Sequence, residues 1–554
     1  MDLFGLAGGV TSVKAVRPSR LLALPSWPGL SGPPNAAPAA KGGPDRPGHD
    51  EGWRITTKRR RAVSALPALA ICVPLLAGCM VGPDYKRPDA PTPVAFKELQ
   101  GWKISQPADA VDKGDWWSVY HDPELDRLER MVEVTNQTVK VSEADYRNAV
   151  ALVAEARASL FPTIGVSPGV SRFGGGGGSG SSVRSSINSG NSSFSSGGRS
   201  GTTYSISGTV SWVPDVWGSV RRQIESSVSS AQVSAADLAN AKLSAQATLA
   251  ADYFDLRAED SLAQLLTETV AAYRRALQIT ENQYRAGTTA STDYVTALAL
   301  LQSTQAQLIA VGVQRAQFEH AIAVLTGHPP SDVTIAPAPL AADVPVLPPG
   351  LPSELLERRP DIAAAERAMQ QENALIGVAV AAYYPTISLS ALGEYAGNPI
   401  GQLFNVGNQI WSLGASASET VFNGGERRAA VLAARATYDA SVATYRQTVL
   451  TAFQGVEDAL SDLRILELQA QAEALAVAST RRAVEATLNA YKAGTVPYTS
   501  VITEQTSLLS NQQSALAVQQ SRLVASVALI EALGGGWSSA DLPKKIEWAN
   551  PLPP

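Results

Sequence analysis

The stretch TYSISGTVSW, residues 203–212, shows strict alternation of apolar and polar side chains. On one side of an extended chain lie only Ser and Thr; on the other, with Gly208 among them, lie Tyr204, Ile206, Val210 and Trp212. A period of two predicts a β-strand with one apolar and one polar face. Such strands occur in soluble sheets and in membrane barrels, so the rest of the sequence must decide which solvent the apolar face meets.

Three further segments share this alternation, namely 163–170, 386–395 and 411–418. A Gly/Ser tract without a packing pattern, 171–202, joins the first two strands and reads as a loop. The sequence therefore predicts two β-hairpins, at about 162–214 and about 385–422.

The composition of the strands favours a membrane barrel over a four-stranded soluble sheet. No amphipathic helix follows to cover the apolar face, and the polar face is almost wholly Ser, Thr and Gly. Aromatic residues predicted to face lipid lie near the strand ends, as in a barrel girdle: Tyr204, Trp212, Tyr395 and Trp411. Because the smallest bacterial barrels need about eight strands, four strands also predict an oligomer.

The chain contains two similar halves, which is the signature of an internal duplication. The matched stretches are Phe161–Ile164 with Tyr384–Ile387, Val216–Arg222 with Phe422–Arg428, and Tyr284–Thr288 with Tyr491–Thr495. The glycines that bound the long segment of each half are 69 residues apart in one half and 70 in the other. Each half is thus predicted to hold one hairpin, one very long segment and one shorter returning segment.

The long segments are predicted helices at 218–285 and 425–492, with returning helices at 290–326 and 497–533. In the second long segment, apolar residues recur at steps of three, four and seven, as in a heptad stripe: Val431, Tyr438, Val442, Tyr445, Val449, Phe453, Val456, Leu460 and Leu463. A helix of this length is about 100 Å long. It requires a coiled coil, a rod or a barrel of helices rather than a compact domain.

The N-terminal segment 1–78 reads as an extension followed by a secretory signal. A basic cluster at 58–61 precedes an apolar run at 62–78, and Leu-Ala-Gly-Cys ends at Cys79. That ending resembles a bacterial lipobox, which predicts lipidation of Cys79; the alternative is an ordinary signal peptide with a chance cysteine. The only other cysteine, Cys72, lies in the segment to be removed, so no disulfide is expected within the mature chain.

Charge and motif content exclude several function classes. Removing 1–78 takes away 10 of 45 basic and 4 of 50 acidic residues and leaves a net charge of −11, which argues against nucleic acid as a partner. We find no Cys/His cluster with metal spacing, no phosphate-binding loop and no Ser/His/Asp arrangement. The sequence predicts neither an enzyme nor a cofactor or metal site.

Several short motifs in this order resemble the TolC-like outer-membrane efflux channels, in their NodT/OprM-like lipoprotein branch. The match covers nearly all of 79–536, and its motifs are Val81–Pro88, Trp116-Trp117, Asp122-Pro123, Leu160–Thr163, Asp215–Gly218, Leu355–Asp361, Phe422–Gly425 and Leu533–Trp537. The resemblance implies a mainly α-helical protein with a transmembrane β-barrel: a homotrimer with one 12-stranded barrel, continued by a periplasmic α-barrel.

The same resemblance implies the partners and the function. An inner-membrane pump, of the proton-driven RND type, and a periplasmic adaptor protein would dock at the helix ends furthest from the outer membrane. Drugs or other small molecules would leave passively through the trimer. Two alternatives stay open: a conduit for type I protein secretion, and a structural trimeric coiled-coil lipoprotein that spaces the membranes.

The resemblance also implies a gate and docking surface at the two helix turns. The residues are Tyr284, Gly287, Thr288 and Asp293 at the first turn, and Tyr491, Gly494, Thr495, Val496 and Tyr498 at the second. Asp293 is expected to bond to Tyr491 and hold the tip closed, whereas the alternative is that Asp293 only caps or solvates its helix. The usual inward acidic ring after the second turn is absent, so we expect Val496 and Tyr498 to seal the constriction.

The predicted organisation follows from these assignments. Between the halves, Arg359 and Asp361 are expected to form a structural ion pair. The segments are 1–78 (extension and signal), 79–123 (lipidated N-terminal segment), 124–327 (repeat 1), 328–352 (equatorial linker), 353–534 (repeat 2) and 535–554 (C-terminal tail).

Overall fold

The computed structural model describes residues 80–93, 95–98, 115–173, 201–341, 343–345, 355–543 and 546. All of them belong to one compact unit, Ala68–Pro554. The predicted leader 1–78, the lipidation candidate Cys79 and most of the Gly/Ser tract lie outside the described residues.

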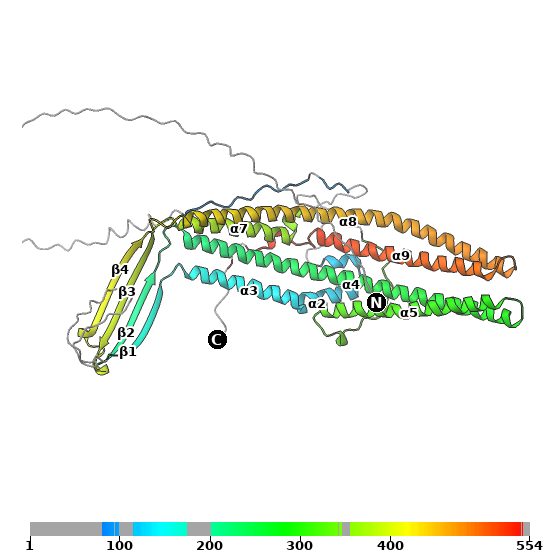
Figure 1. Ribbon diagram of the computed structural model, residues 1–554, viewed down its shortest axis with the longest axis horizontal. Coiled ribbons are helices and arrows are strands. Elements are labelled where there is room, and N and C mark those ends of the chain that lie inside the picture. The colour runs from blue at the N-terminus through cyan, green and yellow to red at the C-terminus, as the bar shows by residue number, and fades with distance from the viewer. Residues whose placement is uncertain are drawn as a thin grey trace, which may run out of the picture. The chain divides into compact units, whose positions relative to one another are not determined.

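The four predicted strands form one antiparallel sheet in chain order (Figure 1). They are β1 (Thr163–Phe173), β2 (Gly201–Trp212), β3 (Thr386–Gly397) and β4 (Gln409–Ser418). Each strand is longer than predicted at the end away from the helices, where Phe173 pairs with Gly201 and Tyr395 with Gln409. The added residues do not continue the apolar alternation from which the strands were predicted. Pairing with a neighbouring strand nevertheless holds their backbone extended.

The register places most apolar positions on one face of the sheet, while Phe173, Leu392 and Ile410 lie on the other. Ile164 faces Val210, Val210 faces Ala391, and Ala391 faces Leu413 in one continuous row. The neighbouring row, on the opposite face, is Thr163, Ser211, Ser390 and Gly414. In the single chain the apolar face stays open, with Leu413 76% exposed.

The helices repeat in length between the two halves. The α-helices are α2 (Pro123–Thr135), α3 (Gln137–Ala158), α4 (Ser219–Arg285), α5 (Ser291–Leu325), α6 (Leu355–Arg358), α7 (Pro360–Ala381), α8 (Glu426–Lys492) and α9 (Tyr498–Ala532). The 3-10 turns are η3 (Trp116–Tyr120), η4 (Pro330–Asp332), η6 (Ile400–Gln402), η7 (Val406–Asn408) and η8 (Ser539–Asp541). α3 and α7 have 22 residues each, α4 and α8 have 67, and α5 and α9 have 35.

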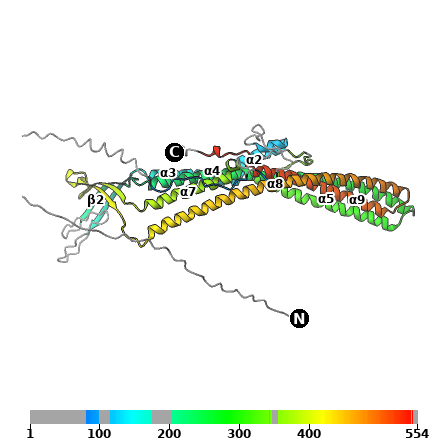
Figure 2. The same ribbon diagram turned by 90° about the horizontal axis from the view of Figure 1, so that it is seen from above.

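The long helices pair with the returning helices and meet the sheet at their other end. α4 packs on α5 and α8 packs on α9, as both views show (Figures 1 and 2). The middle of the predicted heptad stripe of α8 points into the protein, where Tyr445, Val449 and Val456 are fully buried. By length and composition, α5 is the one described helix that could cross a membrane.

A core cluster surrounds the middle of α4 and α8, where the N-terminal helices pack. Trp116 and Trp117 of η3 are buried in this cluster, which also contains the aromatic pair Tyr253 and Phe254 of α4. Asp122 caps α2 by accepting from the Glu124 amide at 2.9 Å and also accepts from the Tyr253 hydroxyl at 2.6 Å. This one carboxylate therefore ties the start of α2 to the long helix.

A buried ion cluster holds the described part of the linker against the helices. Asp260 of α4 lies between Arg257 and Arg315, at 3.2 and 2.7 Å. The Arg315 guanidinium donates to the Ile335 carbonyl at 2.7 Å, and Asp260 accepts from the Ala338 amide at 3.1 Å. Because the charges of this cluster are paired and hydrogen-bonded, these interactions offset the free energy needed to remove the charges from water.

A buried carboxyl group in α2 makes stability depend on pH. Glu129 is fully buried, neither of its oxygens has a partner among the described residues, and burial raises its pKa to about 9. The folded state therefore holds this carboxyl protonated, while the unfolded state ionises it near the ordinary value of 4.5. The stability that the protonated Glu129 contributes is fully present below pH 4.5, and it is lost as the pH rises toward 9.

Glu129→Gln should remove this pH dependence. We expect the unfolding temperature of the variant minus that of the wild type to increase as pH rises from about 5 to about 8. Thermal unfolding followed by circular dichroism at both pH values measures the gain, with the exposed Glu143→Gln as the matched control. An equal difference at both pH values would contradict the assignment.

The two faces of the sheet can be tested at adjacent residues of β4. Leu413→Arg puts a charge on the apolar face and should cost about 2–4 kcal/mol at the middle of a bilayer. Ser412→Arg puts the same charge on the polar face and should be tolerated. The yield of membrane-inserted protein measures the difference; equal insertion of both variants would mean that the faces are wrongly assigned.

Candidate functional site

The two helix turns have the same backbone geometry. Gly287 and Gly494 adopt φ values of 73° and 74°, a conformation that glycine adopts without strain. After each glycine, a threonine amide donates to a carbonyl five residues earlier: Thr288 to Gln283 and Thr495 to Ala490. The threonine hydroxyls donate to the same two carbonyls, at 3.0 and 2.9 Å.

A hydrogen bond joins the two turns, but its partner is not the expected one. The Tyr491 hydroxyl donates to the Gln283 side-chain oxygen at 2.6 Å. The predicted bond from Tyr491 to Asp293 is wrong for this chain, because the single phenol proton of Tyr491 goes to Gln283. The Asp293 carboxylate instead accepts from the Thr289 hydroxyl at 2.7 Å. Asp293 nevertheless affects Tyr491 through its charge. Burial raises the pKa of the Tyr491 phenol, and the negative charge of Asp293 raises this pKa further.

Tyr498 does not seal a passage, which corrects the second expectation about the tip. Its side chain is only 3% exposed and packs with Ala297 and Val501 between the helix ends. Its ring also contacts Tyr491 at a centroid distance of 5.2 Å. Burial raises the pKa of Tyr498 to about 12, so the phenol stays neutral at physiological pH. Val496 stays partly exposed in the turn itself.

The outer surface of the first turn carries a pair of tyrosines. The rings of Tyr284 and Tyr294 are stacked, with centroids 5.9 Å apart and planes 8° apart. Tyr284 remains exposed, as does its neighbour Arg285, which pairs with Glu281. The pair offers an apolar face with a charged rim, a composition found at protein interfaces.

At the opposite end of α4, the segment 80–84 lies against the start of this helix and against α7. The Val81 amide donates to the Trp217 carbonyl at 3.2 Å. The Arg222 guanidinium, almost fully buried, binds Asp84 at 2.8 Å and Glu225 at 2.7 Å. A Cβ at Gly82 would lie 2.5 Å from the Gly377 Cα, so only glycine fits at this crossing.

The four aromatic residues predicted to face lipid all lie on the apolar face of the sheet. Tyr204, Tyr395 and Trp411 are at the end remote from the helices, and Trp212 is at the helical end. The Trp212 indole donates to the Leu160 carbonyl at 3.0 Å. Next to it, Trp217 stacks on Tyr384 with centroids 4.9 Å apart.

This combination of sheet and helices matches a known family. The sequence profile described as "Outer membrane efflux protein" matches residues 130–328 and 351–535. The chain belongs to the outer membrane efflux protein family. Its place is accordingly the outer membrane, from which the long helices extend into the periplasm.

The relatives agree with the family in sequence. The probable efflux pump outer membrane protein TtgC of Pseudomonas putida is 30% identical over 480 residues, which cover 85% of this chain and 96% of TtgC. The outer membrane protein OprJ of Pseudomonas aeruginosa is 27% identical over 86% of this chain and 97% of its own length.

Solved structures agree in fold. The outer-membrane channel OprN superposes with a TM-score of 0.75 at 28% identity and covers 83% of this chain and 100% of its own. The open state of the MtrE channel of Neisseria gonorrhoeae superposes with a TM-score of 0.70 at 26% identity. The match covers 83% of this chain and 99% of the MtrE chain. The fold is thus that of the TolC-like channels, whose β-barrel continues into an α-barrel.

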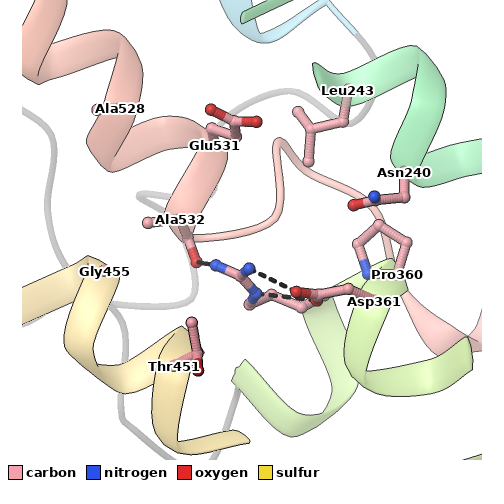
Figure 3. Close-up of a pocket in the computed structure, with 10 residues that line it drawn as sticks. Asn240, Leu243, Pro360, Asp361, Thr451, Gly455, Ala528, Glu531 and Ala532 are labelled. Carbon is pink, nitrogen blue, oxygen red and sulfur yellow. Dashed lines mark hydrogen bonds and ion pairs between the residues drawn. The ribbon is translucent and has the colours of Figure 1, made fainter. Parts of the chain in front are cut away.

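A cavity of about 300 Å³ lies where α4, α7, α8 and α9 of this efflux protein meet (Figure 3). The Arg359 guanidinium binds Asp361 at 2.6 Å and donates to the Ala532 carbonyl at 2.8 Å. Arg359 therefore fastens the start of α7 to the end of α9, and its charge is neutralised within the protein.

The structure also shows functional residues that the sequence did not reveal. Gln283 carries the contact between the turns, and Arg222 fastens the segment 80–84 to α4. An isolated glutamine in a long helix gives no pattern. Arg222 belongs to a stretch repeated between the halves, but the repeat does not identify its partner. Among the described residues, no group of His, Cys, Asp and Glu could hold a metal ion.

Tyr491→Phe should loosen the tip by removing its bond to Gln283. A neutral hydrogen bond of this kind contributes about 0.5–1.5 kcal/mol, so hydrogen exchange of the last amides of α4 and α8 should become several-fold faster. Tyr284→Phe is the matched control, because its ring stack with Tyr294 survives and its hydroxyl makes no hydrogen bond within the described part of the chain. Equal protection in both variants would contradict a role for the bond.

Proposed function

We propose that the chain forms a homotrimeric, passive exit duct for small molecules across the outer membrane. The observation that carries this proposal is one chain with four strands sharing an exposed apolar face, joined to two 67-residue helices. Four strands are about half of the smallest barrel. Three chains would supply 12, with the Ser/Thr/Gly face towards water and the apolar face towards lipid.

The aromatic residues support two belts at the membrane surfaces. Tyr204, Tyr395 and Trp411 would lie at the outer surface, and Trp212 at the periplasmic surface, since aromatic side chains favour these boundaries. The two groups are separated by the length of the strands, which at 10–12 residues match a bilayer when tilted.

Lipidation of Cys79 is the second part of the proposal. Its chain neighbour Met80 packs against Gly218, where a Cβ would lie 2.6 Å from the Met80 side chain. Gly218 begins α4, directly below the sheet. Acyl chains on Cys79 would therefore enter the inner leaflet beside the barrel and anchor the chain durably.

The partners we propose are a periplasmic adaptor and an inner-membrane pump of the RND type, which supplies the energy. The exposed turns around Gly287, Thr288, Gly494 and Thr495, with Tyr284 beside them, would be the docking surface. Relatives are named for toluene efflux and for antibiotic efflux, which supports small apolar molecules as cargo.

The link between the turns is the proposed gate. Tyr491 and Gln283 join the ends of α8 and α4, and Asp293 lies close enough to Tyr491 to affect its pKa. With Tyr498 buried, Val496 is the partly exposed apolar side chain left to narrow the passage. Opening would separate the two helix pairs at this contact.

Conductance in planar bilayers tests both the duct and the gate. Purified trimers should conduct, and Tyr491→Phe and Gln283→Leu should each raise the resting conductance because each removes the same bond, whereas Tyr284→Phe should not. The double variant should match the single variants. Unchanged conductance in both single variants would overturn the gate, and the absence of any conductance would overturn the duct.

A further inference from the structure

The loop between β3 and β4 carries large apolar side chains on its surface. It covers residues 398–408 and lies at the end of the sheet remote from the helices (Figure 1). Ile400 is 61% exposed, Phe404 69% and Val406 84%. Large apolar side chains gathered on a surface mark a place where a protein or a membrane covers it.

The loop folds back onto the apolar face of the sheet. The ring of Phe404 contacts the ring of Tyr395, with centroids 5.5 Å apart and planes at 63°. Tyr395 lies on the apolar face, where it is paired with Ile206. The apolar surface of the loop is therefore continuous with the face of the sheet that the proposed function places in lipid.

Arg172 marks the level at which the apolar face ends. It lies on this face of β1 and is paired with Thr202, at the end of the strand remote from the helices. An arginine is tolerated on a lipid-facing surface where its guanidinium reaches the headgroups. Thr202 lies four residues, about 13 Å, beyond Ile206 along β2. The ring contact of Phe404 thus lies on the membrane side of Arg172.

The charge pattern favours lipid over a water-soluble partner. No charged residue occurs between Glu394 and Glu419, so the whole loop and all of β4 are uncharged. A surface that docks a soluble protein has a polar rim that stays in contact with water. A surface that lies among acyl chains needs no such rim, because charged side chains are costly there.

The backbone of the loop supplies hydrogen-bond partners for itself. The Gln402 amide donates to the Pro399 carbonyl at 2.9 Å, and the Asn408 amide donates to the Asn405 carbonyl at 2.9 Å. The Asn408 side chain also donates to the Gln402 carbonyl at 2.8 Å. Backbone groups that are paired in this way can approach the acyl chains, where water is scarce.

We propose that the loop 398–408 is a lipid-binding surface, which inserts Ile400, Phe404 and Val406 among the acyl chains of the outer leaflet. This inference rests on the proposed function, which places the apolar face in lipid, and it extends that face beyond the strands. Each apolar side chain that leaves water then helps to hold the sheet at its depth in the membrane.

Spin labels on single cysteines test the insertion in the full chain. Ile400→Cys and Val406→Cys replace highly exposed side chains, so neither removes a packed contact. Each variant is labelled with a nitroxide, reconstituted in phosphatidylcholine vesicles and exposed either to oxygen, which concentrates in lipid, or to a water-soluble nickel chelate. For both labels, the ratio of oxygen to nickel accessibility should be several-fold higher than for a label in water.

Two adjacent positions of β4 calibrate this ratio. Leu413→Cys puts the label on the apolar face of the sheet, and Ser412→Cys puts it on the polar face. The unsubstituted chain, whose only cysteines are Cys72 and Cys79, reports any label at those two positions, and its signal is subtracted.

The outcomes separate the loop from the channel. Ratios at Ile400 and Val406 that match the ratio at Leu413 would support the insertion. Ratios that match Ser412 would overturn it, because the loop would then lie in water. Labels that neither reagent reaches would also overturn it, since protein would then cover the loop. Equal ratios at Leu413 and Ser412 would instead overturn the proposed function, because both faces of the sheet would meet the same solvent.

Discussion

A sheet that lies in lipid must pair all its backbone donors and acceptors, including those at its edges. In this chain the constraint acts on four strands whose apolar face is continuous from Ile164 across to Leu413. Four strands are too few to curve into a closed barrel. One chain alone therefore cannot close such a barrel, and the proposed trimer would meet the same requirement that orders the strands.

The duplication extends this requirement from the sheet to the helices. Because α4 and α8 have the same length, and so do α5 and α9, both helix pairs reach the same height before they turn. The turns at Gly287 and Gly494 then meet, and Tyr491 can reach Gln283. A small polar contact at the tip thus depends on equal helix lengths over 67 residues.

Sequence reasoning succeeded where a pattern has a period and failed where a side chain has a choice of partners. Alternation identified the face of every strand, and heptad spacing identified the buried side of α8. The predicted bond between Tyr491 and Asp293 was wrong because the phenol donates its one proton to Gln283, while Asp293 accepts from Thr289, four residues away in the same turn. Glu129 and Gln283 gave no signal, since a single polar residue in a helix looks exposed until its neighbours are placed.

The sequence by itself determined the hairpins, the long helices, the duplication and the membership of a channel family, because each of these depends on local periodicity or on short motifs in order. Only the tertiary structure decided the contacts between segments distant in the chain. It placed Met80 at the foot of the sheet, turned Tyr498 inwards and joined Gln283 to Tyr491. These choices depend on how helices rotate and shift against each other by a few ångströms, and the side-chain pattern of one helix does not determine that packing.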